Sequence, residues 1–402
     1  MKKRMLAVMA CFLCLVCFTS CLRHSGMFGD VTDDSTAMID TTPTDTTAPE
    51  TDAPVVNTAS FIGCGDNIIY YGTWRDAQSK SDGTRQYSFR HIYKNVEDII
   101  SDADIAFINQ ETVCSQSFPP ESYPQFNSPV DLTYDIADVG FDVVCMANNH
   151  MLDKGALGLR ESFDNWNDRG VHVIGCYEEV EDTSRYVTYY EENGITIAFV
   201  AYTEFTNLSQ DPSSQGLWAP YLKQSDVVGD IREADENADF VIVSVHWGEE
   251  GHFEPSDLQK SYAKIMADSG ADVILGHHPH VIQPVEWITG KDGNKTLCAY
   301  SLGNFVHEQA SDFNVPGGML SFNIVAEEGK DATAEDVEFI PTVCHYPQSF
   351  YNNTVYLLED YTETLCSSHA VKTYYNNTIS LDRLKKYVTD TISAEFLPDY
   401  LK

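Results

Sequence analysis

The feature that most constrains the fold is a series of short apolar runs, which alternate with amphipathic stretches from Ala59 onward. The runs are rich in Val, Ile and Phe and are too short for helices. Such runs are typical of strands that are buried on both faces. The clearest amphipathic stretch runs from Asp257 to Ser269, where Ser256 and Gln259 have the spacing of a capping box. Alternating strands and helices predict an α/β fold with a mainly parallel sheet. The expected strands are Ser60–Cys64, Ile105–Asn109, Val143–Ala147, His172–Gly175, Ile195–Tyr202, Phe240–His246, Val273–Leu275, Leu297–Ser301 and Leu320–Val325, and further helices are expected over Ile92–Ile100, from Asp131 to before Gly140, over Ala156–Trp166 and around Leu381–Glu395.

The N-terminus has the layout of an export signal. Lys2, Lys3 and Arg4 precede an apolar run that ends at Phe18 and is too short for a membrane span. The sequence Phe18-Thr19-Ser20-Cys21 resembles a bacterial lipobox, in which Cys21 receives the lipid, and an ordinary cleaved signal peptide is the alternative. We therefore predict a lipoprotein signal peptide over residues 1–20 and an extracytoplasmic protein that is lipid-anchored to the cell membrane.

Composition divides the rest of the chain into three parts. Residues 21–57 are rich in Thr, Asp and Pro, which predicts a disordered acidic linker. Residues 58–325 hold the alternating strands and helices of the main domain, and residues 326–402 form a C-terminal extension to which the sequence assigns no function. The net charge of −36 argues against nucleic acid as a partner.

The cysteines after Cys21 lie largely in apolar runs and lack the paired spacing of metal sites. Buried free thiols are therefore favoured, although an exported protein can also form disulfides. These residues are Cys64, Cys114, Cys145, Cys176, Cys298, Cys344 and Cys366.

Polar residues recur just after the expected strands, which is where ligands bind in parallel sheets. The strongest case is Gly276-His277-His278-Pro279-His280, in which His278 and His280 alternate around a proline and could face one ion. A surface histidine cluster without a metal is the alternative. The second case is Asn148-Asn149-His150 with Asp153, in which Asn149 would complete a metal shell, His150 would donate a proton and Asp153 would orient its ring. A plain turn, which also favours Asn-Asn, is the alternative.

Four other strands end in candidates that are weaker when taken alone. Asp66 could be a metal ligand or a turn aspartate, and Glu111 a ligand, a general base or a solvated loop acid. His246 could be a ligand or a core histidine, and Asn304 a residue of the pocket wall or of a plain turn. Mixed oxygen and nitrogen donors favour zinc, manganese or iron. Two close ions would need about this many ligands, with one carboxylate shared.

A basic segment over residues 75–94 stands out in this acidic chain. Arg75, Arg85 and Arg90 could bind an anionic polymer such as polyglutamate, or a phosphate ester, by guanidinium–carboxylate or guanidinium–phosphate pairing. A solvated loop without a ligand is the alternative.

At these motifs the chain resembles the CapA family of poly-γ-glutamate capsule proteins, which is related to calcineurin-like metallophosphatases. The resemblance implies a four-layer α-β-β-α sandwich with metal ions between the strand ends of two sheets, and His150 as proton donor to a leaving group. Where the wider superfamily has Asp-x-His, this chain has Ile68 in the third position, so one of the two metal sites is expected to be weak or absent. The matching pieces are Gly65-Asp66, Asn109-Gln110-Glu111, the runs from Gly140 to His150 and from Gly270 to Val281, His246-Trp247-Gly248-Glu249 and Tyr300-Ser301-Leu302-Gly303-Asn304-Phe305, and the implied metal ligands are Asp66, Glu111, Asn149, His246, His278 and His280.

The resemblance leaves three functions open. The first is a metal-dependent hydrolase or transferase that acts on a γ-glutamyl or related surface polymer. The second is a non-catalytic accessory of capsule export, which would hold the polymer and work with other capsule-synthesis proteins. The third is a general phosphoesterase of the cell surface.

Overall fold

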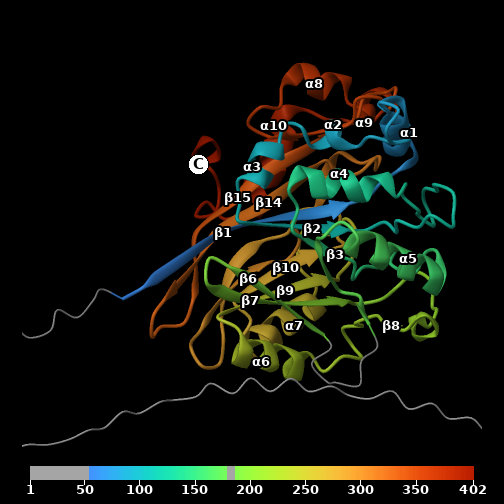
Figure 1. Cartoon of the computed structure of the whole chain (residues 1–402). Helices are drawn as coiled ribbons and strands as arrows, with labels where there is room; N and C mark the ends of the chain where they lie inside the picture. Colours follow the sequence, from blue (N-terminus) through green and yellow to red (C-terminus); the bar gives the residue numbers. More distant parts are fainter. Residues whose placement is uncertain (1–53, 179–185) are drawn as a thin grey trace, which may run out of the picture. The chain divides into compact units, whose positions relative to one another are not determined.

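Two β-sheets pack against each other and helices cover their outer faces, as the four-layer prediction requires (Figure 1). The computed structural model describes residues 54–178 and 186–402. The predicted signal peptide, Cys21 and most of the predicted linker lie outside the described residues. Residues 53–402 form one compact unit.

The first sheet has eight strands, and its parallel half carries much of the candidate site. Strands β1, β2, β3 and β4 run parallel, and β13 pairs in parallel with the end of β1. Strands β14, β15 and β16 extend the sheet in antiparallel order on the other side of β1. The strands are β1 (Val56–Asn67), β2 (Ile105–Gln110), β3 (Val143–Cys145), β4 (His172–Ile174), β13 (Asn304–Val306), β14 (Pro316–Glu327), β15 (Thr333–His345) and β16 (Thr354–Leu357).

The second sheet has six strands in the order β11-β12-β10-β9-β7-β6. Its four central strands run parallel, and the two edge strands are antiparallel. Strands β5 (Tyr177–Glu178) and β8 (Leu217–Trp218) form a separate small sheet. The strands of the second sheet are β6 (Val187–Glu192), β7 (Ile195–Thr203), β9 (Phe240–His246), β10 (Val273–His277), β11 (Val285–Thr289) and β12 (Lys295–Ala299).

The helices that the sequence predicts begin and end close to the expected residues, with one exception, and four further helices, α1, α6, α8 and α9, were not predicted. The capping box of α7 is formed as expected. The predicted helix Ile92–Ile100 is two short helices, α2 and α3, and between them the Asn95 amide donates to the Val355 carbonyl at 3.1 Å. The helices are α1 (Tyr71–Ser79), α2 (Arg90–Tyr93), α3 (Glu97–Ser101), α4 (Asp131–Val139), α5 (Gly155–Asn167), α6 (Val227–Asn237), α7 (Asp257–Ala267), α8 (Glu363–Ser368), α9 (Ala370–Thr373) and α10 (Leu381–Thr391), with 3₁₀ turns at Pro212–Gln215, Asp312–Asn314 and Asp399–Leu401.

The central strands of the second sheet are buried on both faces, which explains their unbroken apolar sequences. In β7, Phe199 points into the core between the two sheets, whereas Val200 points into a second core beneath α6 and α7. Successive side chains of a strand face opposite sides of the sheet, so each face must be apolar. Full burial of one such side chain stabilises the fold by about 1.5–3 kcal/mol.

The chain after residue 326 belongs to the same sheet as the site. Strand β14 spans residues 316–327, so the predicted boundary between residues 325 and 326 falls inside it. Strand β15 then pairs with β14 along most of its length. All seven described cysteines are buried and free, which confirms the prediction of free thiols. Within the described ranges, no helix combines the length and hydropathy needed to cross a bilayer.

One device recurs at the starts of the parallel strands. An aspartate stands directly before each of four strands, and its carboxylate accepts a backbone N–H near the start of the neighbouring strand. This contact fixes the register of two adjacent strands at the edge opposite the candidate site. The pairs, each 2.8 Å long, are Asp104 with Ser60, Asp142 with Ala106, Asp239 with Thr196 and Asp272 with Val241.

Replacing Asp272 should change how stability depends on pH. Burial raises the pKa of Asp272 to about 8, whereas an unfolded aspartate has a pKa of about 3.9. Between these values the folded chain keeps a proton that the unfolded chain has released, so stability falls as the pH rises through this window. Asparagine still accepts the Val241 N–H and does not ionise. We expect Asp272→Asn to recover about 1–3 kcal/mol at about pH 9 and nothing at about pH 4. Urea unfolding of both proteins at the two pH values measures this. The expectation fails if the free energy of unfolding changes equally with pH in both proteins.

Candidate metal centre

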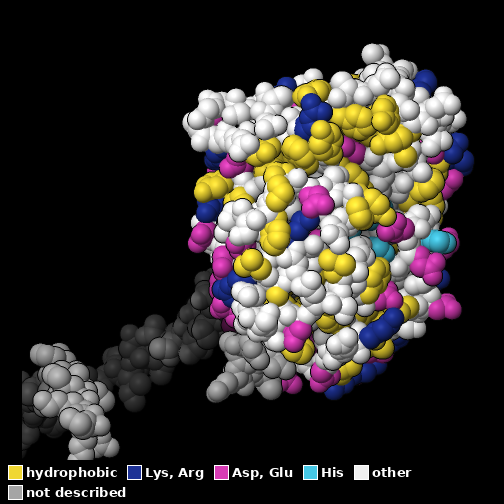
Figure 2. All heavy atoms as spheres, turned by 90° about the vertical axis from the view of Figure 1, so that its right-hand side faces the viewer, with side chains coloured by type: hydrophobic (Ala, Val, Ile, Leu, Met, Phe, Trp, Pro, Cys, Tyr) yellow, Lys and Arg dark blue, Asp and Glu magenta, His cyan; other side chains and the backbone are white. Residues whose placement is uncertain are grey.

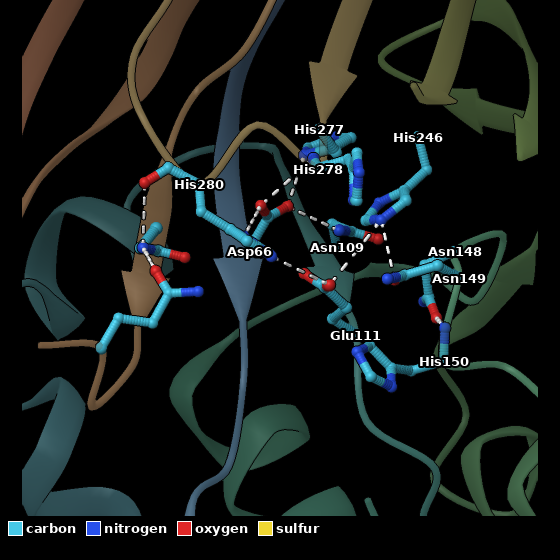
Figure 3. Close-up of polar contacts among 12 residues, drawn as sticks. Asp66, Asn109, Glu111, Asn148, Asn149, His150, His246, His277, His278 and His280 are labelled. Atoms are coloured by element: carbon cyan, nitrogen blue, oxygen red, sulfur yellow. Dashed lines mark hydrogen bonds and ion pairs between the residues drawn. The ribbon is translucent and has the colours of Figure 1, made fainter. Parts of the chain in front are cut away.

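The predicted site residues meet at the carboxyl ends of parallel strands from both sheets (Figure 3). Asp66 is the penultimate residue of β1 and lies opposite Asn109 of β2, and His246 ends β9 opposite His277 of β10. The two sheets face each other, so their strand ends present side chains to one space. All six predicted ligands, Asp66, Glu111, Asn149, His246, His278 and His280, are buried and lie in one cluster.

Glu111 lies at the centre of this cluster. Its Oε1 is 3.7 Å from Nε2 of His246 and 3.6 Å from Nε2 of His280. Two sets of side chains place their donor atoms within 4.8 Å of one another, Glu111 with His278 and His280, and Glu111 with Asp66 and His246. Both sets contain Glu111, so Glu111 is the carboxylate that two cations would share.

Asp66 connects the first sheet to the loop that follows β10 in the second sheet, residues 278–280, which we call the histidine loop. Its Oδ2 accepts the His278 backbone N–H at 3.2 Å and lies 3.0 Å from Nδ1 of His280. Its Oδ1 accepts the Asn109 amide at 2.8 Å and lies 3.4 Å from Nδ1 of His277. Burial alone would raise the pKa of Asp66, but hydrogen bonds with His277 and His280 outweigh it and hold that pKa well below its usual range.

Electrostatics keep two of the histidines neutral. Burial lowers the pKa of His246 far below its usual value, and burial together with the His280 charge lowers that of His278 to about 3. Burial also opposes the charge on His280, yet the Glu111 and Asp66 carboxylates raise its pKa to about 9. Burial raises the pKa of Glu111 well above its usual range. Neutral imidazoles have the free lone pair that metal coordination needs.

The backbone of the histidine loop is strained. His278 and His280 have φ angles of 97° and 55°, a region that side-chain-bearing residues rarely adopt. The side-chain amides of Asn304 and Asn314 both donate to the His280 carbonyl, at 3.1 and 2.9 Å. Asn304, predicted to line the pocket wall, therefore positions the loop that carries two of the ligands.

The unpaired polar atoms of the cluster fit a bound cation. Within the described residues, both carboxylate oxygens of Glu111 and Nδ1 of His278 are buried without a hydrogen-bond partner. Leaving one such group unsatisfied costs about 1–3 kcal/mol, and more for a charged group. A divalent cation would satisfy them, and oxygen with imidazole donors suits manganese, zinc or iron.

His150 and Asp153 form a dyad beside the cluster. Nδ1 of His150 lies 2.6 Å from Oδ2 of Asp153, which also accepts the Phe126 backbone N–H at 2.7 Å. The carboxylate fixes the ring and leaves Nε2 for a proton transfer, which is the arrangement a general acid needs. The Asn207 amide lies 3.3 Å from Nδ1 and 3.4 Å from Nε2 of the same ring.

Sequence reasoning missed three residues of the site. Asn207 follows the strand that ends at Thr203, so the strand-end pattern that found the other residues could have found it. Asn109 and His277 were noted within their motifs but given no role, and both contact Asp66.

Two of the three predicted substrate-binding arginines are paired elsewhere. Arg85 forms ion pairs of 2.9 Å with Asp135 and Asp138 of α4, and Arg90 pairs with Glu97 of α3. Their guanidinium groups are therefore already matched with carboxylates. Arg75 instead donates to the Tyr351 hydroxyl at 3.1 Å.

Gly276 allows the strand that carries the histidine loop to approach its neighbour. A Cβ at this position would lie 1.9 Å from the Tyr300 carbonyl oxygen, which is backbone and cannot rotate away. We expect Gly276→Ala to lower the free energy of unfolding by about 3 kcal/mol or more, because the strand must shift. Urea denaturation measures this effect. Gly83→Ala is the control, because nothing lies within 4 Å of that Cβ and only its positive φ is penalised. Similar losses in both variants would contradict the expectation.

The parallel strands of both sheets end toward the right in Figure 1, and Figure 2 views the molecule from that side.

Comparisons with known proteins identify relatives of this chain. It is 31% identical over 267 residues to the PGA biosynthesis protein CapA of Bacillus subtilis (strain 168), covering 63% of this chain and 64% of that protein. It is 36% identical over 180 residues to the capsule biosynthesis protein CapA of Bacillus anthracis, covering 43% of this chain and 42% of that protein. The chain thus matches less than two thirds of the length of either relative.

Among solved structures, the chain is similar to the calcineurin-like phosphoesterase YfkN from Bacillus subtilis, with 10% identity and a TM-score of 0.39 over 84% of this chain and 97% of that chain. Residues 60–309 match the family described as bacterial capsule synthesis protein PGA_cap. Because this match covers more than half of the 402 residues, the chain belongs to the PGA_cap family of bacterial capsule synthesis proteins.

Proposed function

We propose that this protein is a metal-dependent hydrolase or transferase that acts on a γ-glutamyl or related polymer of the cell surface. The observation that carries the proposal is the position of Glu111, between two histidines and beside the His150–Asp153 dyad. The polymer class follows from the family and from the printed name of the Bacillus subtilis relative.

The donor set of the cluster would hold one or two divalent cations. Bound cations of this kind polarise the attacked carbonyl or phosphoryl group and lower the pKa of a water molecule. Ile68, in the position where the wider superfamily has a histidine, is apolar and buried, so one of the two cations lacks that ligand. The residues that would hold them are Asp66, Glu111, Asn149, His246, His278 and His280.

In hydrolysis of a γ-glutamyl amide, water adds its oxygen to the carbonyl carbon and the carbon–nitrogen bond breaks. The departing nitrogen needs a proton, and Nε2 of His150 would supply it while Asp153 stabilises the ring. Transfer to another acceptor replaces water by an amine or a hydroxyl group and uses the same proton donor.

The test measures metal and turnover on one preparation. The purified full-length chain is analysed for bound metal and assayed with poly-γ-glutamate, a phosphomonoester and a phosphodiester. A double variant, His278→Ala with His280→Ala, is the control. Metal content and polymer cleavage that both disappear in the double variant support the proposal. Cleavage of phosphate esters alone, or a rate on the polymer equal in both proteins, would overturn it.

A second candidate is a non-catalytic accessory that holds the polymer. It is favoured by one relative, the "Probable polyglutamine synthesis accessory protein" of Mycobacterium tuberculosis (strain ATCC 25618 / H37Rv), which is 27% identical over 239 residues. Binding of poly-γ-glutamate without turnover, in a metal-loaded chain, would select this function over the first.

The location of the protein is part of the proposal. The lipobox-like sequence that ends at Cys21 supports a lipid anchor on the outer side of the membrane. We expect Cys21→Ser to abolish labelling by a radioactive fatty acid and to release the protein from the membrane fraction. Labelling that persists in this variant would exclude Cys21 as the lipidation site.

A further inference from the structure

A cavity of about 300 Å³ lies between α1 and the C-terminal extension. Its walls combine aromatic rings from both segments with one guanidinium group, and Glu308 also lines it. The face in Figure 2 shows hydrophobic and basic side chains next to each other in its upper part. The rings belong to Tyr71, Phe350, Tyr351, Tyr374 and Tyr375, and the guanidinium to Arg75.

We propose that this cavity binds a carboxylate-bearing glutamyl unit of the polymer, with Arg75 as the anchor. The proposal rests on the proposed function for the identity of the polymer. It also gives a role to the C-terminal extension, to which the sequence assigned none.

Arg75 is held in place and has a free charge. Its guanidinium lies 5.2 Å from the ring centre of Tyr71 and 5.9 Å from that of Tyr351, and it donates to the Tyr351 hydroxyl at 3.1 Å. In the described part of the chain, no carboxylate lies within ion-pair distance of Arg75, unlike Arg85 and Arg90. In a chain of net charge −36, such a guanidinium is available for a carboxylate of a ligand.

The cavity wall is rigid. Gly72 has no room for a side chain, because a Cβ there would lie 2.5 Å from Oε1 of Glu308 and 2.7 Å from Cβ of Phe350. Glu308 accepts hydrogen bonds from the Gly72 backbone at 3.1 Å, the Thr73 hydroxyl at 2.7 Å and the Asn353 amide at 3.1 Å. These contacts fix the extension against α1, so little conformational entropy remains to be lost on binding.

The lining of the cavity suits a γ-linked glutamyl unit. In such a unit the free acid is the α-carboxylate, and two methylene groups lie between the α-carbon and the amide carbonyl. The carboxylate matches the fork of guanidinium donors, and the methylene groups pack against tyrosine rings, which bury apolar surface at low entropic cost. A neutral ligand would leave the guanidinium unmatched.

Tyr70 connects the cavity with the metal centre. It precedes Tyr71 in the sequence, and burial together with the negative charges of Glu111 and Glu308 raises its pKa. The Tyr70 ring also packs edge-on against Phe126, with ring centres 5.1 Å apart, and Phe126 packs edge-on against His150 at 4.8 Å. A series of ring contacts therefore leads from the residue next to the cavity to the His150–Asp153 dyad.

The test measures binding without catalysis. γ-Linked glutamate oligomers of one defined length are titrated into the purified full-length chain by calorimetry, with a chelator present to prevent turnover. Loss of a bidentate contact should make binding by Arg75→Gln about tenfold weaker. Arg232→Gln is the matched control, because Arg232 lines a different cavity, formed with Asp239 and Asp272 near the strand starts, and it should bind as the unchanged chain does. Tyr351→Phe keeps the ring, removes the hydroxyl that holds Arg75, and should weaken binding by a smaller factor.

The outcomes separate this proposal from the proposed function. Equal affinities for the unchanged chain and Arg75→Gln would overturn the cavity proposal, even if the polymer is cleaved. Equal binding of γ-linked oligomers whose α-carboxylates are converted to carboxamides would overturn it too, as would a neutral oligosaccharide that competes for the cavity. Binding that depends on Arg75 in a chain without turnover would support the cavity and overturn only the hydrolase.

Discussion

Replacing Glu111 with glutamine will remove the stabilisation by metal without lowering the stability of the metal-free chain. Both oxygens of Glu111 are buried without a hydrogen-bond partner among the described residues, and burial raises its pKa well above the usual range. Burial disfavours the charge of this carboxylate, and glutamine has nearly the same shape without that charge, so the metal-free fold should accept it. A bound cation needs the carboxylate, because both candidate donor sets contain Glu111.

The measurement is thermal unfolding with and without added manganese, zinc or ferrous iron. A ligand present at about 100 times its Kd stabilises a protein by about 2.7 kcal/mol, and Glu111→Gln should lose all of this gain. Glu338→Gln, at an exposed position of β15, is the matched control and should keep it. If the metal-free Glu111→Gln chain unfolds at a temperature well below that of the metal-free unchanged chain, Glu111 has a structural role and the expectation is wrong.

Replacing His150 with glutamine should slow turnover by about 10²–10⁴-fold and leave the metal content unchanged, because general acid catalysis contributes about this factor. Asp153→Asn should also lower the rate, since Asp153 orients the ring through the 2.6 Å contact. Residues that act as a unit are not additive, so the double variant should be about as slow as His150→Gln alone.

Rate and metal content are measured on the same samples. His172→Gln, at an exposed position at the start of β4, is the matched control and should retain the full rate. If the fold-loss of rate in the double variant equals the product of the two single losses, the two residues act independently. A loss of metal in His150→Gln would assign this histidine to the metal shell instead.

The sequence predicts the strands well and the ends of the strands best. A strand buried on both faces needs a continuous apolar run, and a polar residue directly after such a run is visible without knowing the fold. This signal located Asp66, Glu111 and His246, which the structure brings together from two sheets. The apolar face and the N-terminal cap of α7 could be predicted equally well, because both depend on residues a few positions apart.

The rest depends on contacts that are distant in the sequence. No residue close to Arg85 in the sequence predicts its ion pairs with Asp135 and Asp138, because these residues lie in α4, about 50 positions later in the chain. The same holds for the cavity at Arg75, since its partner Tyr351 is separated from it by most of the domain. Local patterns fix elements, whereas pairing of charges requires the tertiary arrangement.

Strand β1 has a consequence for the order of assembly. It carries Asp66 and lies between β2, which follows soon in the chain, and β14, which is among the last strands to be made. A nascent chain that emerges from its N-terminus must therefore keep one edge of β1 unpaired until about residue 327 has appeared. Such high contact order slows folding and prolongs exposure to aggregation. A chain of this design will be most exposed to association with other chains in the interval before β14 pairs with β1.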